Sequence, residues 1–176
     1  MIFYGEELID ENAYAPLLQR CAVQGLDCFL ITQPYHRVSL NPNGPDQILA
    51  GHSYYGWYMG AHGSAAPYAL SYCNDHPEIF DGLILFGAYP KEKLNRNMKL
   101  IAVYASEDGL YDSDGYEKAK KNFPENTREA TIQGGNHSGF AACGLFKGDH
   151  EASISSDLQQ QKAAEMVRMA LIGIGE

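Results

Sequence analysis

Segments of strand character alternate along this chain with longer segments whose apolar residues recur at helical spacing. The run GLILFGA at 82–88 is apolar throughout, which is typical of a strand covered on both faces of a parallel sheet. The pattern predicts strands at 1–4, 26–32, 57–61, 82–88, 100–106 and 128–133. It predicts helices at 11–24, near 45–50, at 64–74, at 112–123 and at 155–173.

Residues that commonly begin and end helices stand at several predicted boundaries. Gly25 follows the first predicted helix, as a natural C-cap, and Ser155 or Ser156 with Asp157 marks the start of the last. Strands that alternate with helices imply right-handed βαβ units and a parallel sheet. We therefore expect an α/β fold with about six parallel strands and helices on both faces. No repeat or linker divides the chain, so one domain over residues 1–176 is predicted.

The balance of charge argues against a polyanionic partner. The 176 residues carry 13 Lys and Arg against 22 Asp and Glu, a net charge of −9, and no basic block interrupts this balance. We therefore expect neither nucleic acid nor an anionic membrane as a partner, and a solvated acidic surface explains the charge equally well.

The sequence shows no targeting segment and no special cysteine spacing. The sequence shows no basic start followed by an apolar segment and no apolar run of about 18 residues, so it predicts neither a signal peptide nor a membrane span. The four cysteines form no CxxC pair and no zinc spacing. Reduced thiols in a cytoplasmic protein are the expected state.

The stretch WYMGAHGSAAPYA at 57–69 is typical of a buried strand, a tight turn and the start of a helix. Such a turn lifts its apex residue above the sheet edge at strained backbone angles, so the residues two before and two after it must be small. Gly63 at the apex has alanine at both places, whereas Ser64 at the apex would have His62 at one of them. The sequence therefore favours Gly63 as the apex residue, since glycine adopts unusual angles without steric cost.

Here the chain resembles the α/β-hydrolase superfamily, specifically its small bacterial branch of dienelactone hydrolases and carboxylesterases. That branch has an elbow of the form W-x-x-G-G-H-S-L-G-G, and WYMGAHGSAA at 57–66 aligns with it without gaps. The resemblance continues through four further segments and covers nearly the whole chain. These are DGLILFGAYP at 81–90, AVYASEDGL at 102–110, GGNHSGF at 134–140 and GDHEASIS at 148–155.

The resemblance implies a minimal α/β-hydrolase fold and roles for several residues. His137 falls at the position of the general base, and Asp108 at the acid that orients it. Gly63 occupies the position of the serine nucleophile. Ser64 falls where the family has leucine, whose backbone N–H helps to form the oxyanion hole.

A second departure from the family lies after the first strand. The family has a Pro-Gly-Gly-like turn there, which supplies the other oxyanion N–H, and FYGEELID places Gly5, Glu6 and Glu7 in that region. A carboxylate directed into an oxyanion hole would repel the developing charge. Side chains of Glu6 and Glu7 directed to solvent would leave the hole intact, and both alternatives stay open at this point.

Each candidate residue also has a purely structural interpretation. His137 could bond within its own loop, Asp108 could be an ordinary turn residue beside Glu107, and Ser64 could satisfy backbone N–H groups at a helix start. Ser53 in GHSYYG imitates the family motif, but no strand is predicted immediately before it, so we treat it as a coincidental match.

Metal and cofactor sites are not expected. The polar residues that invite a metal interpretation match no zinc or calcium spacing, and we predict no metal and no cofactor. The residues concerned are His52, His62, Asp149 and His150. No GxGxxG follows the first strand, which disfavours dinucleotide binding. Tyr54, Tyr55 and Tyr58 could line a pocket, although aromatic residues beside a core strand more often serve packing.

Three functions remain open. In the first, Ser64 attacks a small ester or acyl substrate after a local shift of the elbow, with His137 as base and Asp108 as its orienter. In the second, the protein is catalytically silent and its pocket binds a small ligand or partner, which Gly63 at the apex and Glu6 and Glu7 at the oxyanion turn favour. In the third, His137 and Asp108 activate water directly. All three place a small-molecule site at the carboxyl ends of the strands, and impaired serine catalysis is the expectation we favour.

Overall fold

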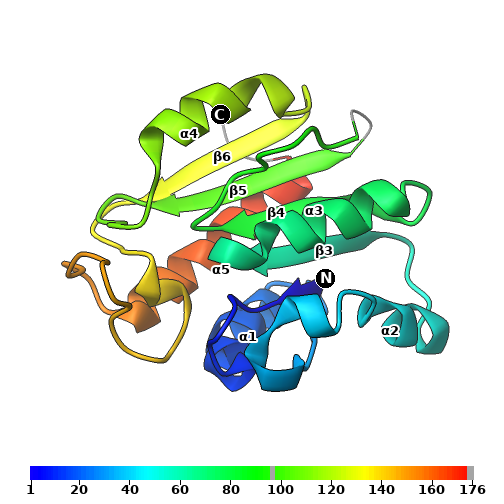
Figure 1. Cartoon of the computed structure of the whole chain (residues 1–176), viewed down its shortest axis with the longest axis horizontal. Coiled ribbons are helices and arrows are strands. Elements are labelled where there is room, and N and C mark those ends of the chain that lie inside the picture. The colour runs from blue at the N-terminus through cyan, green and yellow to red at the C-terminus, as the bar shows by residue number, and fades with distance from the viewer. Residues whose placement is uncertain (96–97, 174–176) are drawn as a thin grey trace.

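The computed structural model describes residues 1–95 and 98–173, and these contain one sheet of six parallel strands (Figure 1). The strand order is β2-β1-β3-β4-β5-β6, with every neighbouring pair parallel. The predicted α/β fold and strand number are therefore confirmed. The strands are β1 (Ile2–Tyr4), β2 (Phe29–Leu30), β3 (Trp57–His62), β4 (Phe80–Phe86), β5 (Lys99–Ala105) and β6 (Thr127–Ile132).

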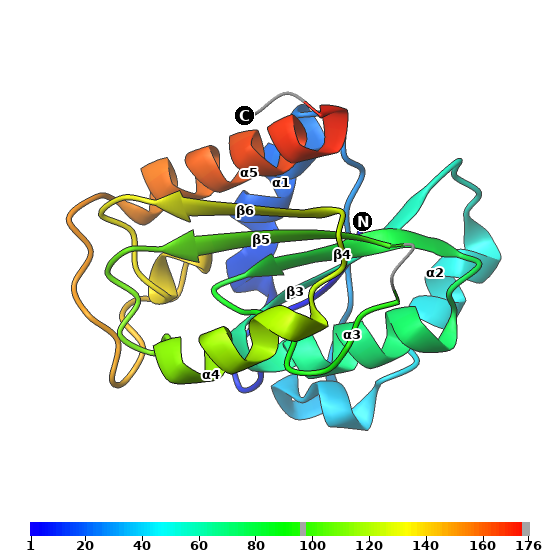
Figure 2. The same cartoon turned by 90° about the horizontal axis from the view of Figure 1, so that it is seen from above.

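Helices cover both faces of this sheet. Figure 2 shows α1 and α5 together on one face and α3 and α4 on the other. The helices are α1 (Ala15–Val23), α2 (Pro45–Gly51), α3 (Ala66–Asp75), α4 (Ser113–Ala119) and α5 (Ser156–Ile172). None of the helices in the described part of the chain has the length and apolarity needed to cross a membrane.

The hydrophobic core divides into layers because successive side chains of a strand point to opposite faces. In β4, Leu83 and Leu85 pack in the layer beneath α3, whereas Ile84 and Phe86 pack in the layer beneath α1 and α5. All four side chains are fully buried. Coverage on both faces explains why β4 is apolar from Gly82 to Phe86, whereas Asp81 near its start is exposed.

Several predicted elements differ in extent from the structure, and the helix expected at 11–24 begins with a 3-10 turn at Glu11–Tyr14, so that α1 starts only at Ala15. The strand expected at 26–32 is reduced to Phe29–Leu30, because it lies at the sheet edge and pairs only with the three-residue strand β1. The helix expected at 112–123 ends as α4 at Ala119 and continues as a short 3-10 turn. The last helix begins as predicted, with the Ser155 hydroxyl accepting the N–H of Leu158.

The parallel arrangement brings five strand ends to one edge of the sheet. β1 leads directly to Gly5 and Glu6, β3 to Gly63 and β4 to Gly87. β5 and β6 lead, within a few residues, to the loops that carry the predicted acid and histidine.

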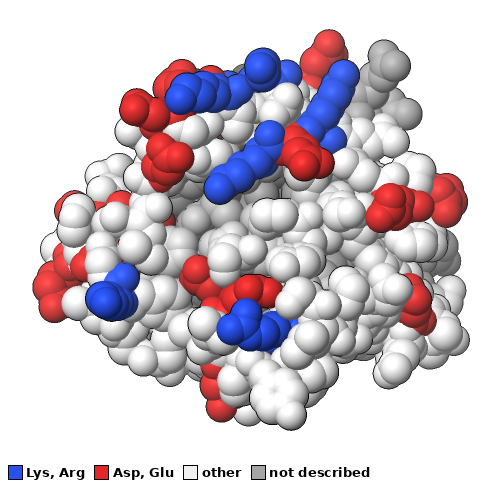
Figure 3. Space-filling model, viewed as in Figure 1, with Lys and Arg blue, Asp and Glu red and all other residues white. Residues whose placement is uncertain are grey.

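On the face shown in Figure 3, acidic and basic side chains are interspersed rather than gathered in one basic patch.

Candidate active site

The turn after β3 has Gly63 at its apex. Gly63 begins a 3-10 turn that leads into α3, and its backbone has φ of +48°, a left-handed conformation that L side chains rarely adopt. A Cβ atom at Gly63 would lie 2.7 Å from Cδ and Oε2 of Glu6. The space that a side chain at the apex would need is therefore taken by the carboxylate of Glu6.

Glu6 is directed into the site, so the alternative in which its side chain points to solvent is wrong. Only 15% of the side chain is exposed. Its Oε2 lies 3.0 Å from Nε2 of His137, and its Oε1 accepts a long hydrogen bond of 3.4 Å from the backbone N–H of Ser64. The carboxylate thus contacts both the imidazole and one backbone donor of the turn.

His137 lies between two carboxylates. Its Nδ1 is 2.9 Å from Oδ2 of Asp108, on the opposite side of the ring from Glu6, and the Asp108 side chain is only 1% exposed. Burial alone would lower the pKa of His137, but the hydrogen bonds and charges of Asp108 and Glu6 outweigh it and raise the pKa to about 9. Near neutral pH the ring therefore carries a proton on both nitrogens and donates to both carboxylates.

The ring of His62 lies against the ring of His137, and its pKa is shifted in the opposite direction. It is fully buried, and its ring centroid is 4.4 Å from that of His137. Burial, together with repulsion from His137, lowers the pKa of His62 well below its usual value. Its Nδ1 is 2.9 Å from the hydroxyl of Tyr14 and 3.5 Å from Glu6 Oε2. His62 is thus a neutral ring that packs under the charged one.

Ser64 is not aligned with the histidine. Its hydroxyl accepts the backbone N–H of Glu7 at 3.2 Å, and no hydrogen bond joins it to His137 in the described structure. The structure thus brings together Asp108, His137 and Glu6. Ser64 contacts the carboxylate of Glu6 through its backbone N–H and not through its hydroxyl.

The loop that carries Glu6 is fixed from several sides. The backbone N–H of Glu6 donates to the Tyr14 hydroxyl, and the carbonyl of Gly5 accepts from the side chain of Gln33. Leu8 has φ of +68°, and its N–H donates to the carbonyl of His36. Left-handed angles at a leucine cost energy, so the surrounding contacts must hold this conformation.

A carboxylate that sequence reasoning considered only as a metal ligand holds the acid and histidine loops together. Asp149 Oδ1 accepts the backbone N–H of Gly109, next to Asp108, and Oδ2 accepts the N–H of Ser138, next to His137. Burial would raise the pKa of Asp149, but these hydrogen bonds lower it. No local sequence signal identifies this role, because the partners come from separate loops.

Several other sequence candidates lie apart from the site. Ser53 is exposed in the loop before β3, and Tyr54 and Tyr55 are exposed as well. Tyr58 packs against the core layer beneath α1 and α5. None of these four residues lines the cavity beside Glu6 and His137.

Among the residues that the structure describes, two groups of histidine and carboxylate side chains lie close enough to hold a metal in principle. The first is Glu6, His62 and His137, and the second is Asp10, Glu11 and His36. Carboxylate–imidazole contacts join Glu6 to His62 and His137 in the first group and Glu11 to His36 in the second, where Asp10 accepts from Asn12. We therefore assign no metal to either.

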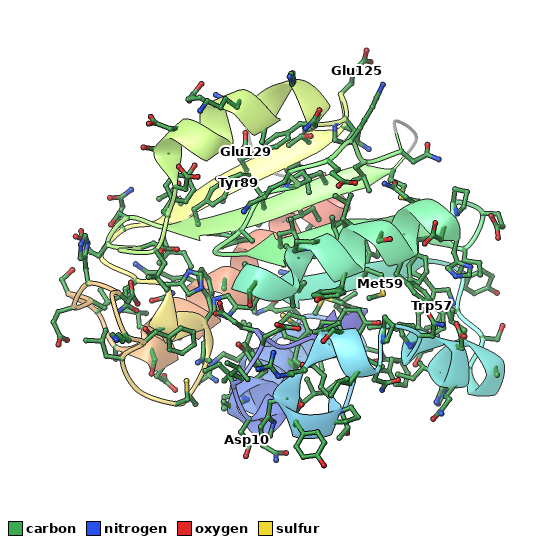
Figure 4. The ribbon with its side chains drawn as sticks, viewed as in Figure 1. Asp10, Trp57, Met59, Tyr89, Glu125 and Glu129 are labelled. Atoms are coloured by element: carbon green, nitrogen blue, oxygen red, sulfur yellow. The ribbon has the colours of Figure 1, made fainter. Side chains whose placement is uncertain are left out.

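A cavity of about 320 Å³ opens above the carboxylate and imidazole. Glu6, Gly63 and His137 contribute to its lining, and Tyr89, Tyr111 and Lys91 stand among the other lining residues. Tyr89 lies on the α4 side of the sheet, near Glu129 (Figure 4). The cavity therefore combines aromatic surface and one lysine with the charged pair.

Comparison with known families and structures gives a consistent picture. The sequence model described as "Alpha/beta hydrolase family" matches residues 1–162. No curated protein matches the chain at a significant level.

Solved structures of similar shape are related only distantly in sequence. A monoacylglycerol lipase from Paleococcus ferrophilus has a TM-score of 0.67 at 9% identity, over 96% of this chain and 93% of that one. The pyrethroid hydrolase PytH has a TM-score of 0.66 at 10% identity, over 98% and 97%. Alpha/beta hydrolase domain-containing protein 10 from mouse has 0.65 at 8% identity, over 98% and 87%. At these identities the likeness concerns the fold alone.

Proposed function

Because the chain belongs to the alpha/beta hydrolase family, we propose that it takes a small ester or acyl-type ligand in its cavity and lacks serine catalysis. The observation that carries this proposal is the partner of His137. Its Nε2, which would serve a serine nucleophile, is 3.0 Å from the carboxylate of Glu6. The apex residue Gly63 has no side chain to compete for that contact.

The cavity supports the ligand part of this proposal. A volume of about 320 Å³ lies within the range of small-molecule sites, and it adjoins the carboxyl ends of the parallel strands. Lipases and hydrolases among the structures of similar shape suggest an ester or acyl group. Membership of the small dienelactone hydrolase and carboxylesterase branch belongs to the same proposal.

The alternative of an active Ser64 requires two rearrangements. The hydroxyl would have to leave the N–H of Glu7, and the Glu6 carboxylate would have to leave His137. The second contact is an ion pair in a mostly buried site, so separating it is costly. We therefore favour loss of serine chemistry over a shifted elbow.

The cellular compartment and the partner of the protein are also part of the proposal. Four free cysteines fit a reducing compartment such as the cytoplasm. A small molecule, rather than nucleic acid or a membrane surface, is the proposed partner, in line with the acidic composition.

Two measurements on the full chain test the proposal. A fluorophosphonate probe, with the modified peptide mapped, should leave Ser64 unlabelled. Saturation-transfer NMR with 4-nitrophenyl acetate and phenylacetate should detect binding that is lost in Ala88→Phe, which fills the cavity. Label on Ser64 would contradict the loss of serine chemistry. Binding that survives Ala88→Phe unchanged would contradict the assignment of the cavity.

A further inference from the structure

We propose that the cavity selects an ester or acyl ligand that carries a neutral aromatic ring, and that Tyr89 and Tyr111 are the residues that recognise this ring. The inference rests on the proposed function, because it names the class of ligand that the same cavity takes. It assigns a role to two side chains outside the group formed by Glu6, His137 and Asp108.

Two tyrosine rings form part of the cavity wall. Tyr89 follows β4 and Tyr111 lies in the loop before α4, and both line the cavity together with Gly63 and His137. The backbone N–H of Tyr111 donates to the carbonyl of Asp108 at 3.4 Å, so this ring belongs to the loop that carries the predicted acid. A ligand that occupies the cavity beside His137 therefore also contacts aromatic surface.

A second pair of tyrosines packs against the first pair and supports it. The rings of Tyr104 and Tyr111 have centroids 5.6 Å apart at an interplanar angle of 72°. Those of Tyr116 and Tyr89 are 5.7 Å apart, also at 72°. Both are edge-to-face contacts, which aromatic rings prefer over a flat stack. The four rings form one cluster, so the orientations of the two lining rings are set before a ligand binds.

Hydrogen bonds fix this cluster at its outer side chains. The hydroxyl groups of Tyr104 and Tyr116 both donate to Oε1 of Glu129, each at 3.0 Å. The hydroxyl of Tyr89 donates to the carbonyl of Asp112 at 2.9 Å, directly before α4. Glu129 is exposed on the edge strand β6 and stands outside the described lining of the cavity. Its effect on a ligand must therefore pass through the tyrosines, which makes it a positioning residue.

The charges in the lining favour a neutral ring. Glu6 and Asp112 contribute carboxylates, whereas His137 and Lys91 contribute positive charge. A ligand group of either sign therefore meets a like charge in the same cavity. A neutral aromatic ring meets none, and it makes edge-to-face contact with a tyrosine whichever of the two rings presents its face.

Small side chains on the neighbouring segments leave room for such a ring. The turn after β3 contributes Gly63 and Ser64 to the lining, and the end of β4 contributes Gly87 and Ala88. The bulky apolar groups of the cavity wall thus come mainly from the loop before α4 and from Tyr89.

NMR titration of the full chain with methyl phenylacetate and methyl cyclohexylacetate tests the inference. The two esters have the same carbon skeleton and differ in the planarity and aromaticity of the ring. The cyclohexyl ring buries at least as much apolar area, so hydrophobic burial alone does not favour the phenyl ester. We expect the phenyl ester to bind at least about five-fold more tightly. Intermolecular NOEs should join its ring protons to Tyr111, and this result depends on no substitution.

Tyr111→Leu should bring the ratio of the two affinities close to one, because it removes the ring but keeps an apolar side chain. Tyr111→Phe, which keeps the ring, should restore the ratio. The matched control is Tyr55→Leu, which removes a fully exposed tyrosine outside the cavity and should leave the ratio unchanged.

The positioning role of Glu129 has its own test. Glu129→Ala removes the shared acceptor of two hydroxyl groups and should lower the affinity ratio at least about two-fold. Glu129→Gln keeps an acceptor oxygen and should restore the ratio. Glu125→Ala, an exposed change just before β6, is the control and should have no effect. An unchanged ratio in Glu129→Ala would overturn this role.

Equal affinities for the two esters, or tighter binding of the cyclohexyl ester, would overturn the aromatic class. Tighter binding of acetylcholine than of methyl phenylacetate would overturn the choice of a neutral ring. If binding in either case is still lost in Ala88→Phe, the proposed function stands. Absence of binding by all three esters would overturn both the inference and the proposed function.

Discussion

The carboxylate of Glu6 lies 3.0 Å from Nε2 of His137, although 131 positions separate the two residues. Asp108 contacts the other ring nitrogen at 2.9 Å, so one imidazole lies between two carboxylates that come from different loops. The arrangement stabilises the protonated ring, and this has a consequence for stability that can be measured.

The free energy of unfolding should fall as the pH rises from about 6.5 to about 9. The pKa of His137 is about 9 in the folded protein, against an ordinary value of 6.5. A raised pKa stabilises the fold fully below the ordinary value, and the contribution is lost as the pH passes the folded value. The loss should be at most about 3 kcal/mol. Urea unfolding at about pH 6 and about pH 10 checks it, and NMR should show His137 titrating near the higher value.

Glu6→Gln is the control for that pH dependence. The amide keeps the shape of the side chain but removes one of the two negative charges that contact the His137 ring. The NMR midpoint of His137 should move down, and the fall in stability should be smaller and should end at lower pH. An unchanged midpoint would show that Asp108 alone sets the pKa.

Gly63→Ser alone should not give an efficient serine hydrolase. Its Cβ would lie 2.7 Å from Glu6, and its backbone would keep a φ of +48°. We expect a loss of stability of about 1–2 kcal/mol from the backbone angle. Fluorophosphonate labelling of the introduced serine should be weak and should rise in the double variant Gly63→Ser with Glu6→Gly. Equal labelling of the single and double variants would contradict the shared space.

Tyr14→Phe should destabilise the site through the hydrogen bonds it removes. The Tyr14 hydroxyl accepts the backbone N–H of Glu6 and lies 2.9 Å from His62 Nδ1. Leaving these buried groups unpaired should cost about 1–3 kcal/mol in urea unfolding. Tyr54→Phe is the matched control, because the Tyr54 hydroxyl bonds Asp27 at the surface, and its effect should stay within about 0.5 kcal/mol. Equal effects of both variants would argue against the bracing role of Tyr14.

Asp149→Ala should loosen the contact between the acid and histidine loops. It removes the acceptor for the N–H groups of Gly109 and Ser138, which should cost about 2–4 kcal/mol. The NMR midpoint of His137 should also fall, since its alignment with Asp108 depends on these loops. Glu151→Ala, an exposed change in the same segment, should leave both quantities unchanged. An unaltered midpoint in Asp149→Ala would show that the loops keep their alignment without it.

Local patterns were sufficient to place most of the fold. The run at 82–88 predicts a buried strand because β4 is covered on both faces, and the serine at 155 marks a helix start through its own short-range hydrogen bond. The edge strand at 26–32 was predicted too long, since its length depends on its neighbour β1 rather than on its own residues. The length of an edge strand depends on the strand it pairs with, and that strand lies in a distant part of the sequence.

The site divides in the same way. Asp108 and His137 were expected from the resemblance to the family, through motifs that lie within single loops, and the apex at Gly63 followed from the sizes of its neighbours. The direction of Glu6 could not be predicted, because its carboxylate finds its partners in other segments. Tyr14 was missed for the same reason, as 48 positions separate it from His62.

The shared volume of Glu6 and Gly63 also constrains how such a site can change by mutation. A serine gained at position 63 while Glu6 remains would crowd the turn, and a Glu6 lost while Gly63 remains would leave the buried imidazole of His137 without one of its carboxylates. Either single step is worse than both together, so the two positions are epistatic over 57 residues of sequence. Conversion between a serine site and a glutamate site on this scaffold therefore passes through an unfavourable intermediate, whichever residue changes first.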